Sequence, residues 1–309
     1  MFKKQIRTFK RNQTLFMLTI PATIWYVIFA YLPMIGVLLA FKRYRVNGGF
    51  FTSLFTSEWV GFDNFKFLFS SSDAWLITRN TVLYNIVFIV LGVVIPILLA
   101  IGINELLNKR LAKFYQSMLF LPYFISWVVV SYFVYAFLSP ESGWINGIIE
   151  QMGGNPVSWY SEVKYWPFII IFMGVWKTLG YNIVVYLAAI CGIDQTYYEA
   201  AMLDGATKWQ QIRYITIPLL KPVIIILFIL AVGRIFSADF GLFYQVTRDS
   251  GALYSVTNVI DTYVYRGLMT LGEVGMSSAA ALYQSGVGFI LIIITNAIIK
   301  KIDRDQALF

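Results

Sequence analysis

The sequence of 309 residues has no histidine and a single cysteine, Cys191. Histidine is the side chain that most readily exchanges protons near neutral pH, and it is a common metal ligand. One cysteine cannot form a disulfide within the chain. Histidine-based catalysis, histidine metal sites and an internal disulfide are therefore excluded, and we expect neither a catalytic nor a metal site. Cys191 ends an apolar run and is expected to be a small buried residue.

Charged side chains are also scarce. They make up 13% of the chain, whereas hydrophobic residues make up 59% and the mean hydropathy is +0.69. Soluble domains carry about 25% charged residues. The composition therefore predicts a membrane protein with several spans. Apolar runs of about 20 residues are long enough to cross a membrane as helices, so we expect an all-α membrane protein. We expect it to form a single membrane domain over residues 1–309.

Six segments are apolar enough to cross a membrane as helices. They are residues 13–41, 81–103, 113–141, 166–190, 222–238 and 273–300, and Lys177 and Arg234 interrupt the fourth and the fifth. The first is too long for the core of a signal peptide, so we predict that it is retained. Part of the first loop, around Phe62–Phe69, is expected to lie on the membrane surface. Residues 259–268 are expected to form a surface helix.

Basic residues indicate the orientation of these spans. With the N-terminus inside, the inner segments hold 14 Lys and Arg residues and the longer outer loops hold 8. Cytoplasmic segments are normally the ones enriched in Lys and Arg. We therefore predict that both termini and the segment 194–222 lie in the cytoplasm.

The segment 194–222 is a polar island between two spans. Thr196 and Glu199 have the spacing of a capping box, which predicts a helix from about Tyr197 that ends at Gly205. Thr207 and Gln210 repeat the signal and predict a second helix, which Pro218 and Pro222 should stop. The apolar side chains of Leu203 and Trp209 would form a docking knob, rimmed by four charged residues: Glu199, Asp204, Lys208 and Arg213.

The order Glu199-Ala200-Ala201, three residues, Gly205, nine residues and Ile215-Thr216-Ile217-Pro218 resembles the EAA loop of permeases in binding-protein-dependent ABC importers. Ile217 stands where the family pattern has leucine. The resemblance implies a type I importer permease fold with a core over about residues 80–300. It also implies a cytoplasmic coupling helix that sits in a cleft of an ATPase. The residues expected to couple to the ATPase are Glu199, Ala200, Ala201, Leu203, Asp204, Gly205 and Pro218.

The sequence has no G-x-x-x-x-G-K-[ST] phosphate loop and no long loop to capture a solute. The resemblance therefore implies a bacterial plasma membrane complex with other chains. Two cytoplasmic ATPase subunits would bind ATP and Mg, a second homologous permease would complete the pathway, and an extracellular solute-binding lipoprotein would deliver the cargo. We expect no cofactor in this chain and no nucleic acid partner.

Two further stretches resemble the carbohydrate branch of the family: residues 59–69 with 79–81, and LPYFISW at 121–127. They imply an oligosaccharide as cargo. Lys177 and Arg234 would then either be satisfied structurally or line the pathway. Aromatic and amide groups at similar depths would contact a sugar. The candidate pathway residues are Lys177, Tyr181, Asn182, Tyr186, Arg234, Asp239, Tyr283 and Gln284.

Other functions remain open at this point. The cargo of such an importer can be glycerol phosphate or another small polar solute, because fold does not set substrate. A membrane enzyme acting on lipid-linked intermediates is disfavoured by the scattered carboxylates and the lack of histidine. A channel or secondary carrier would not need the hairpin, and no inverted repeat is evident. The face of Ser277, Ala281 and Ser285 suits close helix packing, within the subunit or against another one.

Overall fold

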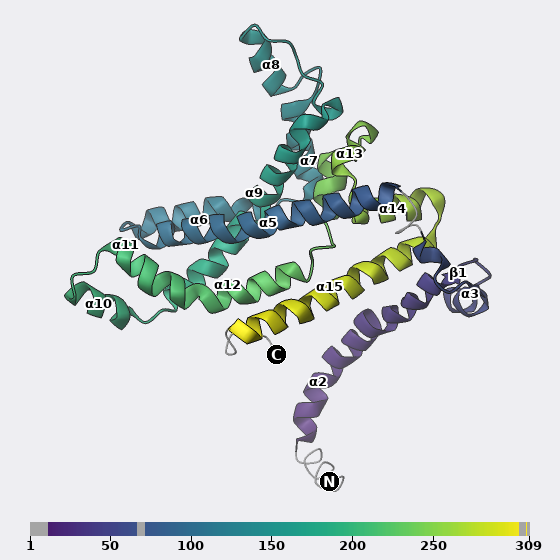
Figure 1. Ribbon diagram of the computed structural model, residues 1–309, viewed down its shortest axis with the longest axis horizontal. Helices are drawn as coiled ribbons and strands as arrows, with labels where there is room; N and C mark the ends of the chain where they lie inside the picture. Colours follow the sequence, from purple (N-terminus) through teal and green to yellow (C-terminus); the bar gives the residue numbers. More distant parts are fainter. Residues whose placement is uncertain (1–11, 67–71, 303–306, 308–309) are drawn as a thin grey trace. The chain divides into compact units, whose positions relative to one another are not determined.

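A computed structural model describes residues 12–66, 72–302 and 307 (Figure 1). Most of these residues are helical, which confirms the predicted all-α class. Within the described ranges, two strands of two residues each, β1 (Lys42–Arg43) and β2 (Glu58–Trp59), pair antiparallel. Five helices are long and apolar enough to cross a membrane there, and a bent pair is a candidate for a sixth span.

The chain forms two compact units, and the first consists of residues 1–69 and 267–283. Its first span is built from α2 (Gln13–Tyr26), a π-helical turn at Val27–Tyr31 and a 3-10 segment at Leu32–Phe41. The loop after it contains α3 (Phe50–Thr56) and a 3-10 turn at Asp63–Phe65. The amide of Asn64 donates to the carbonyls of Ala40 (3.0 Å) and Lys42 (2.9 Å), which closes this loop. Residues 67–69, part of the predicted surface segment, lie outside the described residues.

The second unit consists of residues 70–266 and 284–309. Its helices before the hairpin are α5 (Ser72–Asn104), α6 (Lys109–Phe124), α7 (Trp127–Leu138), α8 (Trp144–Gln151) and α9 (Trp166–Cys191). Short 3-10 turns at Trp159–Ser161 and Val163–Tyr165 precede α9. The hairpin consists of α10 (Gln195–Leu203) and α11 (Lys208–Gln211), and α12 (Ile217–Val232) follows it.

After α12 come a π-helical segment, η7 (Gly241–Val246), a 3-10 turn at Gly251–Leu253 and α13 (Tyr254–Thr257). Two helices complete the chain, α14 (Ile260–Leu271) and α15 (Val274–Ile302). The helix predicted over residues 259–268 is thus confirmed as α14. Helix α5 begins nine residues before the predicted start of the second span, so the first loop is shorter than expected.

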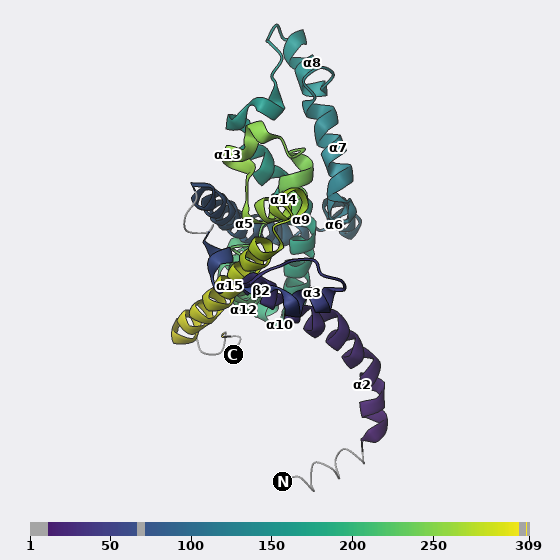
Figure 2. The ribbon, with the colours of Figure 1, turned by 90° about the vertical axis from the view of Figure 1, so that its right-hand side faces the viewer.

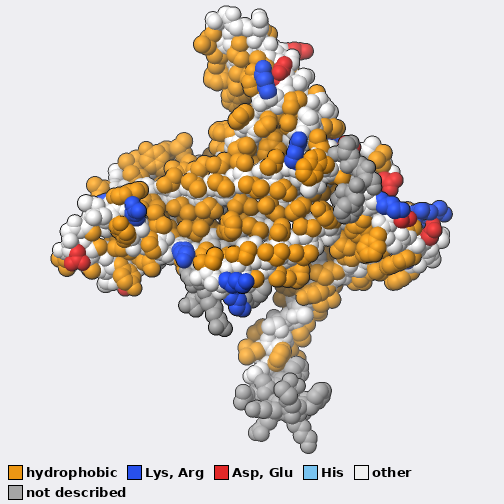
Figure 3. All heavy atoms as spheres, in the orientation of Figure 1, with side chains coloured by type: hydrophobic (Ala, Val, Ile, Leu, Met, Phe, Trp, Pro, Cys, Tyr) orange, Lys and Arg blue, Asp and Glu red, His pale blue; other side chains and the backbone are white. Residues whose placement is uncertain are grey.

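Two apolar clusters hold the second unit together, one toward each end of α9. One joins Trp166 and Ile170 of α9 to Val130 of α7 and Phe243 of η7. The other joins Ile183, Tyr186 and Ile190 of α9 to Ala100 of α5 and Leu220 of α12. In the view of Figure 3 hydrophobic side chains cover the long helices, and charged side chains gather near their ends. That distribution is the one expected of helices surrounded by lipid.

The third predicted span is not a single helix. Helices α6 and α7 meet at an angle of 99° (Figures 1 and 2). Pro122 removes a helical hydrogen bond in the last turn of α6, and Ile125 is extended. The hydroxyl of Ser126 then accepts a hydrogen bond from the Val129 amide (3.3 Å) and starts α7. The sharp break was not predicted from the sequence.

Two other predictions are wrong. Helix α12 ends at Val232, so Arg234 lies in a turn after the span rather than inside it. At Gly233 and Gly288 the backbones of α12 and α15 approach so closely that a Cβ on Gly288 would lie 2.4 Å from the Gly233 carbonyl oxygen. Cys191 is exposed rather than buried, because it ends α9 and no described helix covers it.

Candidate coupling hairpin and solute pathway

The hairpin begins two residues earlier than its capping pattern suggested. Asp194 is the N-cap of α10, and its carboxylate accepts a hydrogen bond from the Thr196 amide (2.9 Å). This bond stabilises the charged form and holds the pKa of Asp194 below its usual range. The predicted Thr196–Glu199 box is therefore wrong: the carboxylate of Asp194 occupies the capping position first, so the helix starts at Gln195.

Gly205 ends α10 as predicted. Its φ is +78°, a left-handed conformation that glycine adopts without strain. The Gly205 amide donates to the Met202 carbonyl (3.1 Å) and the Ala206 amide to the Ala201 carbonyl (2.9 Å), which is a Schellman cap. The second capping box is also confirmed, because the Thr207 amide donates to the Gln210 side chain (2.7 Å). These caps hold the hairpin rigidly at the turn.

The two prolines do not stop the second helix. Helix α11 continues through a π-helical turn at Ile212–Thr216 into α12, so that Lys208–Val232 is one span candidate. Pro218 directly follows the π-helical turn, and Pro222 lies inside the helix. The wider π turn just before Pro218 offsets the steric conflict that a proline creates in an α-helix. The hairpin is therefore joined to the membrane span without a flexible break.

The side chains predicted to dock an ATPase face outward. Leu203 is 90% exposed and Trp209 65% exposed, although both are large and apolar. Seven predicted coupling residues can be placed: Ala201 is half-buried, and Glu199, Ala200, Leu203, Asp204, Gly205 and Pro218 are exposed. An exposed apolar knob of this kind, with charged residues around it, is typical of a protein contact surface.

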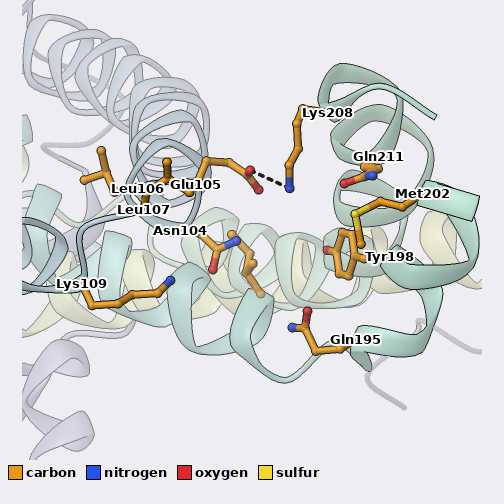
Figure 4. A pocket seen from close by; sticks show the side chains of 11 residues that line it. Asn104, Glu105, Leu106, Leu107, Lys109, Gln195, Tyr198, Met202, Lys208 and Gln211 are labelled. Atoms are coloured by element: carbon orange, nitrogen blue, oxygen red, sulfur yellow. Dashed lines mark ion pairs between the residues drawn. The ribbon is translucent and has the colours of Figure 1, made fainter. Parts of the chain in front are cut away.

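A polar cavity of about 350 Å³ lies behind the hairpin, between α10, α11 and the end of α5 (Figure 4). Across it, the Lys208 ammonium pairs with the Glu105 carboxylate at 3.2 Å. The hydroxyls of Tyr198 and Thr216 lie 2.9 Å apart and tie α10 to the start of α12. Glu105 was not predicted as a site residue, since its partner is about 100 positions away in the sequence. The hairpin is thus connected to two membrane helices.

Lys177 lies at the break between α6 and α7. Its ammonium donates to the carbonyls of Pro122 (3.3 Å), Tyr123 (3.2 Å) and Ile125, and it stands 5.2 Å from the Trp127 ring centroid. The Pro122 carbonyl also accepts a hydrogen bond from the Ile125 amide (3.2 Å). The ammonium adds a charged donor for the carbonyls where α6 ends, because a membrane supplies no water there. The lysine charge is therefore used to satisfy the bend.

Aromatic faces are gathered beside this bend. Tyr181 stacks on Tyr123 with ring centroids 5.1 Å apart, and Tyr123 stacks on Phe120 at 5.6 Å. Tyr181 is 46% exposed and Tyr123 is 43% exposed. Tyr123 was not singled out from the sequence, although it belongs to the LPYFISW stretch. Asn182 is half-buried next to Tyr181, whereas Tyr186 is fully buried in the apolar core.

The remaining pathway candidates lie on other elements. The exposed Asp239 accepts a hydrogen bond from the indole of Trp127 (2.8 Å). Gln284 donates to the Phe236 carbonyl (2.7 Å) and to Asp261 (3.1 Å), so its amide is engaged within the second unit. Tyr283 is half-buried and belongs to the first unit. Arg234 is exposed in the turn after α12.

The apolar helices define an integral membrane protein, and the capped, exposed hairpin gives it a surface suited to contact another protein. Residues 92–304 match the family described as binding-protein-dependent transport system inner membrane component. The chain belongs to this family and is an ABC importer permease. These findings confirm the class expected from the hairpin motif.

Individual relatives match along nearly the whole chain. Protein LplB of Bacillus subtilis (strain 168) is 36% identical over 296 residues, which cover 96% of this chain and 91% of LplB. The polygalacturonan/rhamnogalacturonan transport system permease protein YteP of the same organism is 31% identical, covering 96% and 90%. A crystal structure of a bacterial ABC transporter involved in the import of the acidic polysaccharide alginate matches with a TM-score of 0.86 and 32% identity, over 97% of this chain and 99% of that one.

Proposed function

We propose that this permease carries oligosaccharides, and that it shares the pathway with a second homologous permease in a bacterial plasma membrane. The observation that supports coupling to an ATPase is the hairpin. It exposes an apolar knob, is capped at its turn and is continuous with α12. Two cytoplasmic ATPase subunits, which bind ATP and Mg, would seat the residues from Glu199 to Gly205. Closure of the ATPases would then move α12 directly, and α5 through the Glu105–Lys208 pair.

The cargo assignment has separate support. Several curated relatives are named for sugar transport, among them YteP and the arabinooligosaccharides permease AraP of Bacillus subtilis (strain 168), which is 27% identical over 90% of this chain. A second alginate transporter structure, with a TM-score of 0.84 and 33% identity over 96% of this chain and 97% of that one, holds a periplasmic protein bound to an alginate pentasaccharide. An extracellular binding protein would deliver the sugar to this chain in the same way.

Within the pathway, the stacked rings of Tyr123 and Tyr181 would support sugar faces, and Asn182 and Asp239 would supply polar contacts. Lys177 would act mainly by holding the bend that presents these rings. The other candidates would position neighbouring segments rather than hold sugar; they are Tyr186, Arg234, Tyr283 and Gln284.

The test of the coupling role is the Gly205→Asp variant in the complete transporter. A side chain at φ +78° is strained, and a carboxylate would enter the proposed cleft. We expect the variant to lose co-purification of the ATPase, or to lose the stimulation of ATP hydrolysis by loaded binding protein by about tenfold or more.

The matched control is Gly272→Asp, which places the same side chain at another open, positive φ of +69° outside the hairpin. It should keep both properties. Normal ATPase binding and stimulation in Gly205→Asp would disprove the coupling role of the hairpin.

A further inference from the structure

A second cavity, of about 230 Å³, lies between α7 and η7, away from the hairpin. Ser131 and Tyr132 of α7 line one side of it. Tyr244 and Gln245 of η7, with Arg248 and Asp249 just after it, line the other. By the predicted topology, residues 244–249 of its lining belong to the outer loop after the fifth span, on the side from which a solute arrives. The pathway candidates of α9 are not part of its lining.

The charges in this cavity are not balanced. The Asp249 carboxylate is neutralised by Arg266 at 2.6 Å and accepts a hydrogen bond from the Tyr254 hydroxyl at 3.2 Å. The Arg248 guanidinium stands 4.2 Å from the Tyr135 ring centroid, and no carboxylate of the described residues lies within ion-pair distance of it. One positive charge therefore remains free on the lining. A planar guanidinium held on an aromatic ring is well suited to bind a carboxylate through two parallel hydrogen bonds.

The backbone supports this arrangement. Arg248 and Asp249 both have positive φ values, 54° and 48°. Consecutive left-handed residues other than glycine are costly, and they persist only where surrounding contacts hold them. The Asp249 amide donates to the Tyr244 carbonyl (3.1 Å), and the Ser250 hydroxyl donates to the Tyr160 carbonyl (2.9 Å). This strained turn fixes Arg248 on the cavity.

The other lining groups are those that a sugar ring requires. Tyr132 is 65% exposed, and Tyr244 is held by stacking on Phe240 at 4.8 Å. The Gln245 side-chain amide makes no hydrogen bond to any described residue. Aromatic rings offer faces for the apolar side of a sugar, and the amide offers both a donor and an acceptor. The volume is below the range of about 300–1,000 Å³ typical of sites for whole drug-sized ligands, which suits one unit of a longer chain.

We propose that this cavity is a subsite for a uronate unit of an acidic oligosaccharide, with Arg248 as the residue that binds the sugar carboxylate. The inference rests on the proposed function and narrows its cargo to glycans that carry carboxylates. Lys177 does not supply that recognition, because its ammonium is occupied by the carbonyls at the bend.

The test uses the assembled transporter in lipid nanodiscs and two probes, trigalacturonate and its fully methyl-esterified form. Binding of each probe is titrated by saturation-transfer NMR. We expect the wild-type transporter to bind trigalacturonate more tightly than its methyl ester. Arg248→Gln should weaken the affinity for trigalacturonate by about tenfold or more and change the affinity for the ester by less than about twofold. The affinity of Arg248→Lys for trigalacturonate should lie between those of wild type and Arg248→Gln, because lysine keeps the charge but lacks the planar guanidinium. Lys164→Gln removes an exposed cation from another outer loop and should change neither.

Three results would overturn the proposal: no binding of trigalacturonate by wild type, equal weakening of acid and ester by Arg248→Gln, or unchanged binding of both. If binding is unchanged but the variant loses stimulation by binding protein, Arg248 docks that protein instead. ATPase stimulation is measured on the same samples. If the wild-type complex shows no ATPase stimulation by the binding protein, the proposed importer function is contradicted. If the complex is stimulated but does not bind trigalacturonate, only the subsite is contradicted.

Discussion

At the scale of single residues, two positions control the structure through contacts that a substitution tests directly. Asp194 starts the hairpin helix by accepting the Thr196 amide hydrogen bond. Gly180 lets α9 touch α6, because a Cβ there would lie 2.2 Å from the Leu119 carbonyl oxygen and 2.4 Å from the Phe120 Cα. The first depends on charge, and the second depends on the absence of a side chain.

Asp194→Ala should loosen α10 more than Thr196→Ala does, because it removes the carboxylate that accepts hydrogen bonds from both the amide and the hydroxyl of Thr196. Because the folded pKa of Asp194 is depressed from 3.8, its contribution is present above that value and is lost as the pH falls through the lower folded pKa. Limited proteolysis of the hairpin should therefore speed up in wild type under acid conditions. Asp194→Asn keeps a cap that does not titrate, so its cleavage should not show this dependence. Equal effects of the two alanine variants would refute the assignment of the cap.

Gly180→Ala should destabilise the protein by about 1–3 kcal/mol, since the clash is with backbone that cannot rotate away. Gly102→Ala is the matched control, because nothing lies within 4 Å of a Cβ there. It should be neutral or stabilising by up to about 1 kcal/mol in a helix interior. Thermal unfolding of the purified transporter measures both. Equal unfolding temperatures for the two variants would argue against the close helix contact.

At the scale of elements, the bend between α6 and α7 is the feature on which the candidate pathway depends. Lys177, from the middle of α9, satisfies three carbonyls there, and its neighbours Tyr181 and Tyr123 stack across the same helix pair. The bend and the aromatic surface therefore form together when α9 packs on α6.

Lys177→Met should lower stability by about 1–3 kcal/mol, because carbonyls at the bend lose a charged donor. Uptake should fall in parallel, since the rings of Tyr123 and Tyr181 lose their support. The control is Lys164→Met, an exposed lysine whose loss should change neither property. Unfolding temperature and sugar uptake in proteoliposomes are measured together. If uptake falls while stability is unchanged, Lys177 contacts the cargo instead of maintaining the bend.

At the scale of the whole molecule, much apolar surface is left for lipid and for other subunits. On α15, Ser277 is buried, whereas Ala281 and Ser285 remain exposed, so the small-residue face continues onto open surface. Small exposed side chains allow the backbone of another membrane helix to approach closely. This face is a candidate contact with the second permease.

Ala281→Phe should reduce co-purification of the second permease severalfold, because a ring there would hold a neighbouring helix away. Ile294→Phe is the control: the position is 48% exposed on the same helix, and at 3.6 residues per turn it lies on another face. If Ala281→Phe still co-purifies with the second permease, this face contacts lipid rather than that permease. Tag-based purification with quantification of both permeases distinguishes the results.

Local signals were sufficient for much of this protein. The hydropathy pattern predicted the apolar segments, and Gly205 and the Thr207–Gln210 box predicted the turn of the hairpin, because these features depend on residues within a few positions of one another. The capping of α10 was missed since Asp194 and Thr196 are both good N-caps and the pattern alone does not rank them. The EAA motif identified the importer class because the hairpin surface that is expected to fit the ATPase is built from residues close together in the sequence.

What the sequence by itself determined is therefore the membrane class, the hairpin and the importer family. The tertiary structure decided the 99° bend that Lys177 supports, the end of α12 at Val232, the exposure of Cys191 and the cavity around Arg248. Each of these depends on segments tens to hundreds of positions apart, such as Lys177 with Pro122 or Tyr135 with Arg248. Local pattern is set by the neighbours in the chain, whereas charge satisfaction and cavities are set by helices that meet only after folding.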